Sequence, residues 1–148
     1  MSGLLDHSPA DITRYQLIAG SQGTLPTNNS TWPIFVGNEP DTPDDCITVY
    51  DVTGEAEGIT QIDGEVQERY SIQIRVRSAI HTTNYIKCQS IQNYLDKSIK
   101  RTTLTISSSD YLIHDYIRRQ PILRLGKDTP NSKRELFVLN YLLKVDKT

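Results

Sequence analysis

The sequence contains few of the residues from which reactive or metal-binding sites are built. Its 148 residues include two cysteines, three histidines and one methionine. His7, His81 and His114 are scattered, and Cys46 and Cys88 stand far apart, so no His-x-x-x-His or Cys-x-x-Cys spacing occurs. A metal site is therefore not expected, and no cofactor is predicted.

Long hydrophobic runs are also missing. No apolar run approaches the roughly 20 residues that a membrane-spanning helix needs, and no basic segment followed by an apolar one opens the chain, as it would in a secretory signal. We therefore expect no membrane association and folding in a reducing cytoplasm. In that setting Cys46, in a predicted strand, and Cys88, in a predicted helix, are expected to be buried and unpaired.

A catalytic arrangement is not recognisable either. His114 and Asp115 are a possible base and orienting carboxylate, but adjacent strand residues point to opposite faces, so pairing across strands or contact with solvent is favoured. The glycines at 54, 58 and 64 precede a strand rather than a helix, which argues against a phosphate-binding loop. The sequence therefore predicts a protein that is not an enzyme.

The sequence does contain enough apolar residues to form the core of one domain spanning 1–148. It has 36% hydrophobic and 23% charged residues. Ser8 and Pro9 are typical of a helix start, so a helix is expected over 9–19, with Gly20 as a left-handed stop. A second helix is expected over 82–99, with an apolar stripe of Cys88, Ile91, Leu95 and Ile99 and a polar side that includes Asn84.

Strands are expected where alternating or short apolar runs lie between turn residues. The last of them is apolar on both faces and is predicted to be central in the sheet. Together these elements predict an α+β fold in which two helices pack on a mixed or mainly antiparallel sheet of about five or six strands. The segments that are candidates for these strands are 32–37, 46–51, 68–77, 101–106, 110–119, 123–125 and 134–145.

The strand over 68–77 alternates with a period of two. Its even positions from Tyr70 to Val76 are apolar and are predicted to face the core, whereas Arg75 and Arg77 are predicted to face outward. Before it, residues 52–66 are rich in Gly, Glu and Asp and predict a flexible loop. The N-terminus is expected to be mobile.

Charge is divided unequally along the chain. Residues 1–74 hold twelve acids and two bases, a net charge of −10, whereas residues 75–148 hold six acids and fourteen bases, a net charge of +8. The basic half is the feature that a nucleic-acid-binding protein needs. A simpler interpretation is that these basic residues pair with the acidic half inside one domain or stay solvated.

Four short segments carry a resemblance to a known family. They are the turn Pro40-Asp41-x-Pro43-Asp44, the strand Ile47 to Asp51, the turn Thr53-Gly54 and the strand Gln73 to Ser78 leading into a helix. In this order and spacing, over roughly residues 33 to 100, the chain resembles the tail terminator and minor capsid (tail completion) proteins of long-tailed bacteriophages.

The resemblance implies a structural virion protein that forms a homohexameric ring. Such a ring would cap the head-proximal end of the tail tube and meet a neck or head-completion protein. DNA would pass through its lumen without specific binding, and assembly would take place in the host cytoplasm. Two alternatives remain open: a head-completion or neck stopper protein, and a small nucleic-acid-binding module.

A head-to-tail ring needs two different, complementary surfaces on each subunit, and opposite charges on them would set the register. Prolines and the lack of an acidic twelfth position make Asp41, Asp44 and Asp45 a solvated turn rather than a calcium loop. We expect this acidic turn and residues up to 66 near one surface. We expect the partner surface to carry Arg75, Arg77, Arg118 and Arg119.

Overall fold

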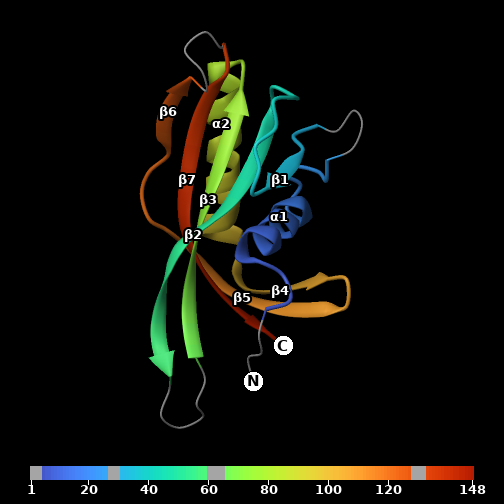
Figure 1. Cartoon of the computed structure of the whole chain (residues 1–148), viewed down its shortest axis with the longest axis vertical. Helices are drawn as coiled ribbons and strands as arrows, with labels where there is room; N and C mark the ends of the chain where they lie inside the picture. Colours follow the sequence, from blue (N-terminus) through green and yellow to red (C-terminus); the bar gives the residue numbers. More distant parts are fainter. Residues whose placement is uncertain (1–4, 27–30, 60–65, 128–132) are drawn as a thin grey trace.

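The computed structural model describes residues 5–26, 31–59, 66–127 and 133–148, and it is an α+β fold of two helices and a curled mixed sheet (Figure 1). The α+β prediction is confirmed, but the sheet has seven strands rather than five or six. The helices are α1 (Pro9–Ala19) and α2 (His81–Asn93), and α2 runs into a π-helical turn η1 (Tyr94–Ser98). The strands are β1 (Ile34–Val36), β2 (Cys46–Ile59), β3 (Val66–Ser78), β4 (Lys100–Ile106), β5 (Ser109–Arg118), β6 (Leu123–Lys127) and β7 (Glu135–Lys147).

The strand order is β1-β2-β3-β7-β5-β4, and among the strand pairs of the described residues only β1–β2 is parallel. Strand β7 is central, as its two apolar faces predicted, because β3 pairs with one of its edges and both β5 and β6 pair with the other. Along that second edge, β5 ends opposite Tyr141 and β6 begins opposite Val138. The two strands therefore form an interrupted line beside β7.

One face of the sheet is covered by the two helices, and α2 lies behind β3 and β7 in the view of Figure 1. The predicted stripe of α2 and η1 is confirmed, since Cys88, Ile91, Leu95 and Ile99 are all buried against the sheet. Asn84 was wrongly expected on the polar side. It is fully buried and donates from Nδ2 to the backbone oxygen of Glu135 at 2.8 Å, which satisfies its amide.

Helix α1 begins as expected, with the Ser8 hydroxyl accepting a hydrogen bond from the Asp11 amide at 3.1 Å. Its end differs from the prediction, because Gly20 has a φ of −88° and is not left-handed. The glycine is needed for space: a Cβ there would lie 2.2 Å from the Tyr94 ring. Tyr94 also bonds to Gln16, so the ring fixes the end of α1 against η1.

The prediction of a loop over 52–66 is wrong for all the residues that the structure describes there. Strand β2 continues to Ile59 and β3 starts at Val66, with irregularities in their register near residues 52–55 and 56–58. Because β3 pairs with β7 only from Tyr70 onward, the ends of β2 and β3 form a two-stranded arm that projects from the body (Figure 1). Residues 60–65 lie outside the described residues.

The chain near its start is attached to the sheet from Asp6 onward. Asp6 accepts from the Ser109 hydroxyl at 2.5 Å and pairs with Lys147 at 2.7 Å, and His7 contacts the Tyr111 hydroxyl at 2.7 Å. Mobility of the N-terminus stays a prediction, and residues 1–4 lie outside the described residues. Neither helix that the structure describes has the length and apolar character to cross a membrane.

Candidate functional site

The acidic turn, residues 39–45, is held by a buried arginine. Arg77 is 2% exposed, and its guanidinium donates to the backbone oxygens of Pro43 at 2.7 Å and Asp44 at 3.3 Å. Ser78 adds a hydrogen bond from its hydroxyl to the Asp45 carboxylate at 2.7 Å. The prediction that Arg77 faces outward is therefore wrong, because carbonyl groups of a distant turn take up its donors.

A second arginine, from the residue just before β7, also binds the acidic turn. Arg134 donates to the backbone oxygen of Asp41 and lies 3.5 Å from the Asp44 carboxylate. The basic half of the chain thus holds the acidic turn within one molecule, as Lys147 holds Asp6. The sequence left open whether the basic half pairs with the acidic half inside one domain, and for these residues the structure shows such pairing.

Arg75 differs from Arg77 although it is only two residues away. It is half-buried, its guanidinium lies 5.7 Å from the centre of the Tyr50 ring, and its Nε is buried without a hydrogen-bond partner. Within the described residues no carboxylate pairs with it. Arg75 is a cation whose hydrogen-bonding capacity is incompletely used.

Arg118 and Arg119 lie at the end of β5, in another part of the sheet. Arg118 Nε lies 3.2 Å from Asp96 Oδ2, and Asp96 accepts from the Tyr141 hydroxyl at 3.0 Å. Burial raises the pKa of Tyr141, so this hydroxyl stays protonated and donates. Arg119 donates to the Ser71 hydroxyl at 3.1 Å and has no acidic partner among the described residues.

The predicted basic surface is therefore not one patch. Along β7, Arg77 is level with Leu136 and Arg118 is level with Tyr141, which separates them by five positions or roughly 17 Å. Arg77 belongs with the acidic turn, whereas Arg118 and Arg119 line an open hollow of about 490 Å³ near η1. The sequence placed these arginines on the correct strands, but it did not predict that they lie at two separate places on the sheet.

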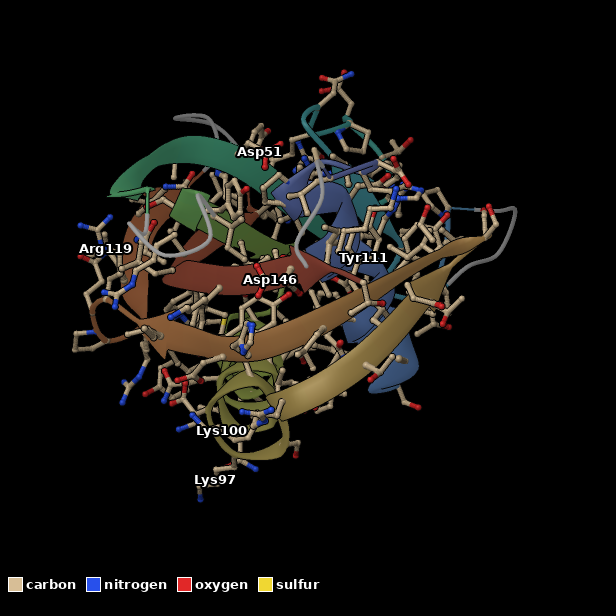
Figure 2. The ribbon with its side chains drawn as sticks, turned by 90° about the horizontal axis from the view of Figure 1, so that it is seen from below. Asp51, Lys97, Lys100, Tyr111, Arg119 and Asp146 are labelled. Carbon is tan, nitrogen blue, oxygen red and sulfur yellow. The ribbon has the colours of Figure 1, made fainter. Side chains whose placement is uncertain are left out.

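A basic end of the molecule includes that hollow, which Lys100, Arg118 and Arg119 line. Lys97, Lys100 and Arg101 come from η1 and β4, and Figure 2 shows Lys97 and Lys100 next to one another, with Arg119 further along the same side. Lys100 pairs with Asp115 at 2.6 Å. With Arg118 and Arg119, five cations face two carboxylates, Asp96 and Asp115, so this end keeps a positive charge.

Glu135 joins three elements and was not singled out by the sequence. Its carboxylate oxygens lie 2.5 Å from His81 Nδ1 and 2.6 Å from Arg124, and its backbone oxygen accepts from Asn84. The hydrogen bond from Arg124, with that from His81, lowers the pKa of Glu135 to about 2. Its partners are eleven and more residues away in sequence, so no local pattern marks it.

His114 and Asp115 do not meet, as the alternation of strand residues predicted. His114 pairs across to Asp146 on β7 at 2.6 Å, and Asp115 pairs with Lys100 on β4. In the part of the chain that the structure describes, no group of three His, Cys, Asp or Glu side chains is placed to hold a metal ion. Cys46 and Cys88 are buried and unpaired, as expected.

Comparison with known proteins gives one extensive match. The model of the family described as "Bacteriophage tail terminator protein" matches residues 13–147. A search of curated proteins gives no match. Among solved structures, a chain of the virion of a native gene transfer agent particle has a TM-score of 0.49 and 10% identity, over 76% of this chain and 78% of that chain. A second solved chain has a TM-score of 0.47 and 14% identity, over 94% of this chain and 91% of its own. These two similarities are too weak to carry a conclusion.

Proposed function

We propose that this chain, which belongs to the bacteriophage tail terminator family, forms a homohexameric ring that caps the head-proximal end of the tail tube. The family match over residues 13–147 carries this proposal. It makes the chain a structural protein of the phage virion. The ring, its position and its partners are the parts that we propose.

The surfaces of the chain support association with protein partners. A closed head-to-tail ring needs two different patches on each subunit. The acidic turn exposes Asp41 and Asp44 at one place, and Arg75, which has no carboxylate partner among the described residues, lies at another on β3. The basic end with Arg118 and Arg119 is a third, separate surface. Opposite charges at two separate places favour a defined order of contact and faster encounter.

The partners follow from the position that we propose for the ring. One side of the ring would contact the tail tube protein, and the other would contact a neck or head-completion protein. DNA would pass through the lumen without specific binding. Assembly would take place in the host cytoplasm before the tail joins the head.

Tail tube assembly in vitro tests this function. Purified tube protein should form tubes of unlimited length alone and tubes of arrested length when the chain is added, with a density at one end in electron micrographs. Solution mass measured at low and high salt should show a salt-sensitive oligomer, or a monomer that assembles only on tubes. Tubes that continue to grow with the chain present would refute capping.

The alternatives separate in the same experiments. A neck stopper or head-completion protein would bind filled heads rather than tube ends. A nucleic-acid-binding module would remain a monomer and bind duplex DNA with an affinity that falls steeply as salt rises. Either result would replace the capping proposal.

A further inference from the structure

One face of the sheet has neither of the described helices over it. The outer face is the side opposite α1 and α2, formed by β2, β3 and β7 and continued by β5 and β6, and Figure 1 shows no helix in front of β3 and β7. Directly paired residues in a sheet lie on the same face. By register the outer face carries Cys46, Thr48, Tyr50, Val52, Ser71, Gln73, Arg75, Arg77, Ile117, Leu123, Leu136, Val138, Asn140 and Leu142, and the acidic turn of the same chain covers it at Arg77.

The outer face has the composition of a protein-binding surface. Three large apolar side chains are exposed on it, Val52 at 45%, Ile117 at 37% and Leu123 at 45%. Arg75 lies between Thr48 and Val138 on this face, with Tyr50 under its guanidinium and its Nε unsatisfied. Leu123 is paired with Val138 on the next strand, and Val52 and Ile117 lie four positions further along the sheet. An arginine beside an aromatic ring and apolar side chains is a frequent centre of protein interfaces.

The acidic turn offers the complementary group. Asp41 is exposed, and its carboxylate has no partner among the described residues. The hydrogen bond from Arg134 goes to the backbone oxygen of Asp41 instead. Pro43 is exposed beside it and adds apolar surface. Arg77 and Ser78 hold the turn in place, so little conformational freedom is lost when it binds.

We propose that the acidic turn of one copy docks on the outer face of a second copy, where the Asp41 carboxylate pairs with the Arg75 guanidinium. This contact rests on the proposed function, since it would be the head-to-tail contact of the ring. The two groups do not pair within one chain: no ion pair joins Arg75 to the turn of its own molecule among the described residues. A carboxylate from a neighbour satisfies Arg75, and the turn that carries this carboxylate covers exposed apolar surface on the same face.

A second copy fits this face better than nucleic acid does. Phosphate backbones are bound by rows of cations, and affinity rises with each phosphate neutralised. The outer face presents Arg75 and, at its rim, Arg119, among apolar and amide side chains. Apolar side chains beside a single arginine are complementary to the acidic turn, which offers proline and aspartate.

The test uses charge reversal in the full-length chain. Arg75→Glu and Asp41→Lys should each weaken self-association by about tenfold or more, because each places like charges in contact. Arg101→Glu and Asp110→Lys are matched controls: they change the net charge equally at exposed positions outside both surfaces and should have no comparable effect. Association is measured by analytical ultracentrifugation at low ionic strength, and circular dichroism and thermal melting check that each variant is folded.

Mixing provides the decisive observation. In an equimolar mixture of Arg75→Glu and Asp41→Lys, each contact between unlike variants joins opposite charges again, so association should recover although each variant alone associates weakly. No recovery in the mixture, or an equal loss from Arg101→Glu, would overturn this contact. If Arg75→Glu does not fold, Leu123→Asp tests the same surface at an exposed position and should weaken association as strongly.

Tube capping separates this inference from the function on which it rests. If the chain caps tubes and Arg75→Glu caps them equally well, the function stands and the contact is wrong. If the unaltered chain neither associates nor caps, both are wrong. If capping and association fall together in Arg75→Glu and return in the mixture, both are supported.

Discussion

Replacing Arg77 by methionine should release the acidic turn from the sheet. Arg77 is 2% exposed and supplies two hydrogen bonds, to the Pro43 and Asp44 backbone oxygens. Methionine fills much of the same volume but donates nothing. The two carbonyl groups then have to find water or remain unpaired.

The expected loss of stability comes from opposing contributions. Each hydrogen bond to a charged group contributes about 1.5–3 kcal/mol. Removing the buried guanidinium also removes the cost of taking its charge out of water, which offsets part of that loss. We expect the free energy of unfolding to fall by about 3 kcal/mol, which in a domain of this size lowers Tm by roughly 6–12 °C.

Urea unfolding followed by circular dichroism measures the difference, with Arg101→Met as the matched control. Arg101 is exposed, so its replacement should change stability by less than about 0.5 kcal/mol. Arg77→Lys keeps the charge but not the forked geometry, and it should lose about half as much as methionine does. A stability of Arg77→Met within about 0.5 kcal/mol of the unaltered chain, or equal to that of Arg101→Met, would refute this account of the turn.

Three further predictions follow from buried or close-packed groups. The pKa of Glu135 is lowered from 4.5 to about 2, so its contribution is present above pH 4.5 and is lost as the pH falls toward 2; Glu135→Gln should flatten that part of a stability profile measured by urea unfolding. Gly20→Ala places a methyl group against the Tyr94 ring and should cost about 1–3 kcal/mol in thermal unfolding, and an unchanged Tm would show that the ring moves freely. Burial raises the pKa of Cys46 to about 11 and that of Cys88 to about 12, so neither thiol should react with a thiol reagent at pH 8 until denaturant is added, and rapid labelling of the native protein would contradict this.

Much of the fold follows from patterns within single segments. The cap at Ser8, the stripe from Cys88 to Ile99 and the two apolar faces of β7 each depend on spacing of a few residues, and the structure confirms all three. The extended strands β2 and β3 were harder to predict. Glycines and acids in residues 52–66 weaken strand propensity, but pairing between the two strands carries β2 to Ile59 nonetheless.

The candidate site was predicted less well, because its contacts join distant segments. Strand alternation placed Arg75 and Arg77 on one face correctly, but alternation does not reveal what covers a face. The turn at Pro43, 34 residues before Arg77, buries one arginine and leaves the other with an unsatisfied nitrogen. Glu135 was missed for the same reason, since His81 and Arg124 reach it only across the fold.

The sequence by itself determined the class of fold, the family and the division of charge between the two halves. These properties depend on composition and short-range order. Only the tertiary structure decided how the charges are used: some pair within the chain, as at Arg77 and Lys147, and others, Arg75 and Asp41 among them, lack an oppositely charged partner among the described residues. Electrostatic energy depends on distance and burial, and neither is fixed until the strands are in register.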